Sequence, residues 1–367
     1  MSQDMDIYRD SAARSESDNN LGDSVVISKY QTAADIANAV LSEVLAKLTP
    51  GVSIATICRS GDNAITAYTS KVYNDTNIEK GIALPTMISI NHYSQYYSPL
   101  MKDSLVLRAG DLVKIELGVH IDGYTATSAH TTILNPSPQQ PVIGRMADVV
   151  AAAYFSCEAV CKSLKPGVKY SDLNNVINQV ADAFKCIPVE GSVSKVMRRY
   201  ILQYDKVVVH RQAEYEPMHK EDWEVEPNEA YAINILMSTG DGKLRQLESR
   251  PTVYKRNVNE TYNLKMQSAR AAFRKISEKF GVFPFSLREL DERDRLGMTE
   301  CIRHNLFTAY PVNGDKPDAV IAHFKLTALV TPYNTVRITL PQTLPYIHSD
   351  LAIPNDSDVA KILFTGD

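Results

Sequence analysis

A short segment occurs twice in the chain, and this duplication limits the possible folds more than any other feature. Residues 48–52 (LTPGV) are followed, 116 residues later, by residues 164–168 (LKPGV). Each copy comes directly after a segment with apolar residues at helical spacing, 36–48 in the first case and 149–164 in the second. Because a Pro-Gly pair breaks a helix, both copies predict a helix end at the same point of a repeated unit.

The predicted elements after each Pro-Gly pair also correspond. In the first copy they are a helix at about 53–70, a turn entering a strand at 110–117 and a Gly-rich hairpin at 119–123. In the second copy the same three elements are predicted at about 171–185, 228–235 and 238–242. Helices grouped against strands in this order are typical of an α+β architecture. We therefore expect two halves, about 24–140 and 141–340, with helices covering a curved antiparallel sheet. Glu116 and Asn234 take equivalent places on central strands, where a two-sided pocket is expected.

The composition favours an intracellular globular protein. Hydrophobic residues make up 44% of the chain and charged residues 22%. No stretch approaches the roughly 18 apolar residues that a membrane span requires, and no apolar signal core stands at the N-terminus. The five cysteines are scattered and odd in number, which favours free thiols in a reducing compartment.

Charge is distributed unevenly along the chain. Residues 1–23 carry six acidic side chains against two arginines, which predicts a disordered acidic segment before a main domain at 24–367. Residues 243–303 carry 14 basic and 8 acidic side chains, a net charge of +6 in a protein whose total is −4. This segment interrupts the second half as a basic insertion.

The insertion contains a predicted amphipathic helix at about 262–280 with one basic face. Basic side chains there and on adjoining hairpin strands can contact phosphates without reading bases, and Tyr254 and Tyr262 could stack on unpaired bases. The candidate nucleic-acid-binding residues are Lys243, Lys255, Arg256, Lys265, Arg270, Arg274, Lys275 and Lys279. The alternative is a solvated helix face. A smaller basic cluster at residues 195–211, predicted as a helix and then a strand, either extends this surface or serves the structure.

Several motifs resemble a known family. Residues 84–91 (LPTMISIN), 113–118 (VKIELG) and 232–240 (AINILMSTG), within the duplicated plan, resemble the pita-bread fold of methionine aminopeptidases and creatinases, the M24 peptidases. The likeness extends from about residue 29 to 340, and the insertion is similar to that of the type 2 branch. Residues 252–256 (TVYKR) and 283–288 (FPFSLR) most resemble its proliferation-associated, non-peptidase members, which include curved DNA-binding proteins.

The resemblance implies a metal site that has lost its ligands. Aminopeptidases of this family hold two divalent metals with two Asp, one His and two Glu, and use a further His beside them. The matching positions here are Glu116, Thr127, Ser192, Asn234 and Lys325, with Tyr96 at the auxiliary His. Because an ammonium group repels divalent cations, no metal, cofactor or catalysis is expected, and Lys325 and Glu116 should lie within a few ångströms of each other.

The resemblance also implies a function. We expect a catalytically inactive protein that binds curved DNA and structured or ribosomal RNA, and acts in ribosome biogenesis or growth regulation. Pre-ribosomal particles and other proteins are the expected partners, in the nucleus with its nucleolus and in the cytoplasm. The alternatives are a residual metalloaminopeptidase and a scaffold that binds peptides or proteins. Another active site, built from Glu116 with His92, His120 or His130, lacks a supporting catalytic motif.

Overall fold

The computed structural model describes residues 16–102, 105–212, 222–340 and 342–364. The first fifteen residues of the predicted acidic segment lie outside this range. Residues 16–23 differ from the prediction of disorder, because Glu16–Asn19 forms a short 3-10 helix and Leu21 is buried. The backbone carbonyl of Asp18 accepts a hydrogen bond of 2.6 Å from the Tyr124 hydroxyl, which ties this segment to the main domain.

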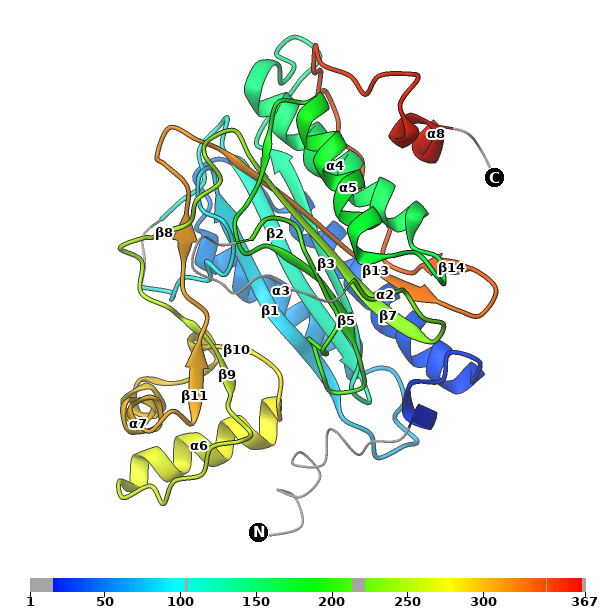
Figure 1. Ribbon diagram of the computed structural model, residues 1–367. Coiled ribbons are helices and arrows are strands. Elements are labelled where there is room, and N and C mark those ends of the chain that lie inside the picture. The colour runs from blue at the N-terminus through cyan, green and yellow to red at the C-terminus, as the bar shows by residue number, and fades with distance from the viewer. Residues whose placement is uncertain (1–15, 103–104, 213–221, 341, 365–367) are drawn as a thin grey trace.

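A nine-stranded antiparallel sheet forms the centre of the molecule (Figure 1). Its main path runs in the order β1 (Lys80–Ile90), β2 (Leu112–Ile121), β3 (Tyr124–Ile133), β13 (Ile321–Val330), β7 (Glu229–Ser238), β5 (Val193–Met197) and β6 (Val207–Val209). Two short strands pair at the side of this path, β14 (Thr335–Arg337) with β13 and β4 (Ile187–Pro188) with β7. The two halves therefore meet where β3 lies beside β13.

Each half of the sheet is covered by its own pair of long helices. Helices α2 (Ser24–Ala46) and α3 (Ile54–Thr69) pack against the first half, and α4 (Gly144–Ser163) and α5 (Tyr170–Ala183) against the second. A short helix, α8 (Asp358–Phe364), packs beside α4. These positions agree with the repeated helices predicted on both sides of each Pro-Gly pair. No helix among the described residues has the length and apolarity needed to cross a membrane.

Apolar and polar side chains alternate along the central strands, so one face of the sheet is apolar and covered by helices and the other face is polar. In β2, Val113, Ile115 and Leu117 join the hydrophobic core under α2 and α3. Successive side chains of a strand point to opposite faces, so Lys114 and Glu116 project away from these helices. The same alternation in β7 and β13 sends their core residues toward α4 and leaves their polar residues on the face that holds Glu116.

The second copy of the repeat departs from the first after its central strand. In the first half, Asp122 and Gly123 adopt positive φ angles of 53° and 82° and join β2 to β3 as a tight hairpin. The hairpin predicted at 238–242 is wrong, because β7 pairs along its full length with β13, about eighty residues further on. The insertion occupies the connection between them. The prediction of a helix in the 195–211 cluster is also wrong, because Val193–Met197 forms strand β5.

The insertion is a small unit with its own core at one edge of the sheet (Figure 1). It contains β8 (Arg245–Gln246), β9 (Val253–Arg256), α6 (Gln267–Phe280), β10 (Phe285–Ser286), the 3-10 turn η2 (Leu287–Glu289), α7 (Glu292–Arg303), β11 (Phe307–Ala309) and β12 (Asn313–Gly314). Since β11 and β12 pair with β9 and β8, the unit continues past the predicted end at residue 303. The predicted helix begins only at Gln267.

Candidate functional site

Four strands place one row of side chains across the middle of the polar face. Glu116 on β2 is paired in register with Ala129 on β3, and Ala129 with Lys325 on β13. Lys325 is in turn paired with Asn234 on β7. Residues directly opposite on neighbouring antiparallel strands share a face. The row therefore brings together Glu116, Asn234 and Lys325, three of the positions expected from the family resemblance.

The Lys325 ammonium group forms an ion pair with the Glu116 carboxylate. Both side chains are almost fully buried, with exposed fractions of 5% and 4%. The side chain between them, Ala129, is a single methyl group, which lets Lys325 extend over β3 to reach β2. The other oxygen of Glu116, Oε2, is buried and has no hydrogen-bond partner among the described residues. The predicted proximity of Lys325 and Glu116 is confirmed.

The amide of Asn234 is fixed by a neutral histidine that the sequence analysis missed. Nε2 of His323 lies 2.6 Å from Asn234 Oδ1, and Asn234 Nδ2 donates to the carbonyl of Val193 at 3.1 Å. Burial and the ammonium groups of Lys325 and Lys114 hold the pKa of His323 well below its ordinary value. His323 sits two residues before Lys325 on β13, so strand alternation would have placed both on one face.

The hydroxyl of Ser192 is part of a closed hydrogen-bond network. Ser192 donates to the carbonyl of Val189 at 2.6 Å and lies 3.1 Å from Nδ1 of His210. The other ring nitrogen, Nε2, lies 3.0 Å from Ser194 Oγ, which accepts from the backbone N–H of Asn234 at 2.9 Å. Burial lowers the pKa of His210 to about 3, so the ring is neutral and has one N–H to donate. This assignment satisfies all three side chains without a metal ion.

Thr127 is also engaged with a protein partner. Its backbone N–H donates to Thr327 Oγ1 at 2.9 Å, and the same hydroxyl donates to the Thr127 carbonyl at 3.0 Å. Tyr96 is the last of the expected positions and has a left-handed φ of 66°. Its ring meets Tyr310 of the insertion edge to face, with centroids 4.8 Å apart.

These donors do not suit a pair of divalent metal ions. Two such ions need bridging carboxylates to offset their mutual repulsion, and here the one carboxylate of the row, Glu116, is paired with an ammonium group. Among the described residues, no group of three or more His, Cys, Asp or Glu side chains is placed to hold a metal ion.

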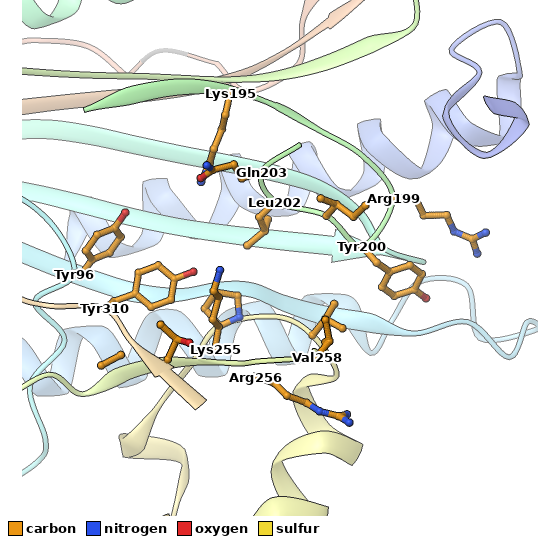
Figure 2. A pocket seen from close by; sticks show the side chains of 15 residues that line it. Tyr96, Lys195, Arg199, Tyr200, Leu202, Gln203, Lys255, Arg256, Val258 and Tyr310 are labelled. Atoms are coloured by element: carbon orange, nitrogen blue, oxygen red, sulfur yellow. The ribbon is translucent and has the colours of Figure 1, made fainter. Parts of the chain in front are cut away.

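Beside this row lies a cleft with cationic walls. One cavity of ≈ 530 Å³ borders Ser192, Asn234 and Lys325, and a second of ≈ 420 Å³ opens toward the insertion. Lys195 on β5 and Tyr96 line both of them. In Figure 2, Lys195 enters the second cavity from one wall and Lys255, on β9 of the insertion, enters it from the opposite wall.

The charge of this cleft favours anions. Lys195, Lys255 and Lys325 line the two cavities together with one carboxylate, that of Asp205, and Lys325 is also paired with Glu116. Burial is the largest cause that lowers the pKa of Lys195, to about 8, and Lys325 and Lys255 lower it further while Glu116 opposes them. A peptide N-terminus, which is cationic, would meet like charges here.

The three histidines considered from the sequence lie elsewhere. His92, His120 and His130 are not among the residues that line either cavity in the described structure. The His120 ring stacks on Phe283, with centroids 4.2 Å apart. His130 contacts Phe324 edge to face. Burial lowers the pKa of His120 to about 3 and that of His130 to about 4, so both are neutral core residues.

Most of the candidate basic residues of the insertion have partners within the protein. Lys275 pairs with Asp294 at 2.5 Å, and Lys279 with Glu289 at 2.6 Å. Arg274 lies 3.7 Å from Glu278.

The guanidinium of Arg270 donates to the carbonyls of Leu264 and Lys265 at 2.9 Å and 2.8 Å. Arg256 lies over the ring of Phe273, and Lys243 makes further interactions. By contrast, the ammonium groups of Lys255 and Lys265 have no hydrogen bond or ion pair with the described residues. Ion pairs within the protein therefore neutralise part of the predicted nucleic-acid-binding surface. Fewer of its basic side chains are available to bind phosphates than the sequence indicates.

Comparison with known proteins identifies relatives over most of the chain. The model of metallopeptidase family M24 matches residues 28–244. The ERBB-3 binding protein 1 of Solanum tuberosum is 40% identical over 330 residues, which cover 89% of this chain and 84% of that protein. Proliferation-associated protein A of Dictyostelium discoideum is 35% identical over 94% of this chain and 89% of its own length. The curved DNA-binding protein of Schizosaccharomyces pombe is 32% identical, with coverage of 95% and 92%.

A solved structure agrees with these matches. The structure of a thermophilic Arx1 superposes with a TM-score of 0.85 at 31% identity, covering 93% of this chain and 98% of that one. The pita-bread fold expected from the sequence motifs is confirmed by this similarity.

Proposed function

The chain belongs to metallopeptidase family M24, and we propose that it is a non-peptidase member of this family that binds nucleic acid. The observation that carries the loss of peptidase activity is the ion pair between Lys325 and Glu116. An ammonium group now stands where the family resemblance implies a metal-bridging carboxylate. Since His210 and His323 also complete the hydrogen bonds of Ser192 and Asn234, the pocket is a stable polar core without metal.

Two observations support nucleic acid as the ligand. Lys195 and Lys255 line one cavity and Lys265 is exposed on the insertion, and cations of this kind bind phosphates without reading sequence. A relative that is 32% identical over 95% of this chain is named a curved DNA-binding protein. We propose that structured RNA and curved DNA are the ligands, and that pre-ribosomal RNA is the RNA involved.

The names of relatives in the proliferation-associated branch also support a proposal for the cellular role. We propose that the protein acts in ribosome biogenesis or growth regulation, in the nucleus with its nucleolus and in the cytoplasm. The relative named proliferation-associated protein A supports the growth-related part of this proposal.

The test is a binding titration with a structured RNA, a curved DNA and a straight DNA of equal length. The variant pair Lys265→Gln and Arg274→Gln removes two exposed cations of the insertion. Reversing Lys275 is avoided because its ammonium group is paired with Asp294. If both residues contact phosphates, the slope of log affinity against log salt should fall by about two units.

The control removes the same charge outside the insertion, with Lys47→Gln directly after α2 and Lys361→Gln on α8. Both control side chains are exposed, at 48% and 64%. The control should bind like the parent. An unchanged slope in the insertion variant would remove the insertion as the contact surface. If none of the three nucleic acids binds at low salt, the proposed function itself is wrong.

A further inference from the structure

The cavity between β5 and the insertion contains two lysines with no protein partner. Lys195 and Lys255 approach from opposite walls (Figure 2), and neither Nζ atom makes a hydrogen bond or ion pair within the described part of the chain. Both stay cationic most readily when an anion lies between them. We propose that this cavity binds a single unstacked nucleotide, with its phosphate held between Lys195 and Lys255. The proposal rests on the nucleic-acid binding proposed above and names one site for it.

Two tyrosines add hydroxyl donors at one end of the cavity. Tyr96 and Tyr310 lie side by side there, and neither hydroxyl bonds to another described residue (Figure 2). Burial, followed by the negative charge of Glu116, raises the pKa of Tyr310, and the same two causes raise that of Tyr96. Both hydroxyls therefore stay protonated near neutral pH and can donate to a phosphate oxygen. Four donors from four separate segments of the chain line the same cavity.

The arrangement of cations favours a phosphate over a carboxylate. A terminal phosphate carries a charge of about −1.5 to −2 at pH 7, which matches two ammonium groups, whereas a carboxylate carries −1. Carboxylates are commonly held by the planar fork of an arginine. The nearby Arg199 is already bound to Asp122, at 2.7 Å. Arg256 also borders the cavity, but its guanidinium lies over the ring of Phe273.

The remaining wall suits a base and the volume suits one nucleotide. Apolar side chains also line the cavity, namely Leu202, Val258, Val282, Pro284 and Ala309. The cavity of ≈ 420 Å³ is within the range of small-molecule sites, about 300–1,000 Å³. A duplex is too wide to enter it. An unpaired or terminal nucleotide can enter, as in proteins that recognise single-stranded RNA.

The experiment is calorimetric titration of the full chain with adenosine 5′-monophosphate, adenosine, inorganic phosphate and an acidic peptide. The monophosphate should bind saturably and adenosine should not. Inorganic phosphate should bind more weakly, because it leaves the apolar wall empty. Lys195→Gln and Lys255→Gln should each weaken binding of the monophosphate by about tenfold or more. Tyr310→Phe, which keeps the ring, should weaken it by less.

Lys47→Gln, which removes a 48% exposed charge outside the cavity, is the matched control and should leave binding of the monophosphate unchanged. Circular dichroism of each variant confirms that it has folded. The proposal is overturned if the monophosphate does not bind, if adenosine or inorganic phosphate binds equally well, or if the lysine variants bind like the parent. Binding of the acidic peptide in competition with the monophosphate would assign the cavity to protein ligands instead.

A second titration separates this proposal from the broader one. Single-stranded RNA with a 5′-phosphate should compete with the monophosphate for the parent protein. If the RNA binds but the monophosphate neither binds nor competes, the cavity site is wrong and nucleic-acid binding stands. If the monophosphate binds but no nucleic acid does, the cavity site stands and the proposed function fails.

Discussion

The ammonium group of Lys325 reaches across the methyl group of Ala129 to pair with Glu116, two strands away in the sheet. Neighbouring strands lie about 4.8 Å apart, so the lysine and glutamate side chains together bridge roughly 10 Å of sheet. A larger residue at position 129 would stand between the two charges. The pair therefore depends on three adjacent strands, β2, β3 and β13, which come from both halves of the duplicated chain.

Removing the lysine should destabilise the fold because it leaves a buried carboxylate without a counter-charge. We expect Lys325→Met to lower the free energy of unfolding by about 3–5 kcal/mol, measured by urea denaturation. The double variant Lys325→Met with Glu116→Gln should recover much of this loss, since the remaining group is neutral. If Lys325→Met alone unfolds like the parent, the two charges do not form the buried pair described above.

The same pair should prevent metal binding. We expect protein dialysed against Co²⁺, Mn²⁺ or Zn²⁺ to retain none of them in stoichiometric amount, because the side chains of Thr127, Ser192 and Asn234 offer only neutral groups that already have protein partners. Elemental analysis measures this directly, and a peptide with N-terminal Met measures activity. Two metal ions per chain together with release of Met would show a working peptidase.

Arg288 should be the main anchor of the insertion. Its guanidinium pairs with Asp62 on α3 at 2.5 Å, and each side chain is 1% exposed. It also donates to Ser98 Oγ at 2.6 Å and to the carbonyl of Thr86 at 3.2 Å. Arg288→Met should cost about 3–5 kcal/mol of unfolding free energy, because Asp62 is left buried and charged.

The matched control for Arg288 is Arg274→Met, which removes an arginine with 74% exposure from the same insertion. A change of no more than about 0.5 kcal/mol is expected there. Equal stability of the two variants in urea would mean that the Arg288 pair contributes nothing to holding the insertion.

The duplicated plan of the chain was predictable because it depends on local signals. Pro-Gly breaks, helical spacing and strand entries locate α2, α3, α4, α5, β2 and β7, and the motifs point to Glu116 and Lys325 as neighbours. The return strand β13 was not predictable in this way. Its pairing with β7 spans about eighty residues, and no turn signal near residue 242 distinguishes an insertion from a hairpin.

The partners within the site were harder to predict than its positions. His210, directly after β6, and His323, on β13, contact Ser192 and Asn234, so only the register of the sheet reveals these contacts. The sequence pattern predicts a helix around Lys195. The segment is instead strand β5, which places Lys195 in the same cavity as Lys255, so this pairing of lysines was not predictable from the pattern. Sequence charge likewise cannot show that Lys275 and Lys279 are already paired.

Nucleotide binding in the cavity should weaken as the pH rises through the pKa of Lys195. That pKa is lowered to about 8, by burial first and then by Lys325 and Lys255, with Glu116 opposing. The ammonium form that binds an anion is therefore complete well below pH 8 and is lost above it. The ligand's phosphate has a pKa of about 6, so its charge hardly changes between pH 7 and 9.

Tyr96 and Tyr310, which line the same cavity as Lys195, do not titrate between pH 7 and pH 9, because their pKa values are raised. We expect the affinity for adenosine 5′-monophosphate to fall by about tenfold from pH 7 to pH 9, as one ammonium group is lost. Calorimetry at constant ionic strength measures this. Lys195→Met should bind weakly with a flat profile over the same range. A parent protein whose affinity is constant or rises with pH would exclude Lys195 from contact with the phosphate.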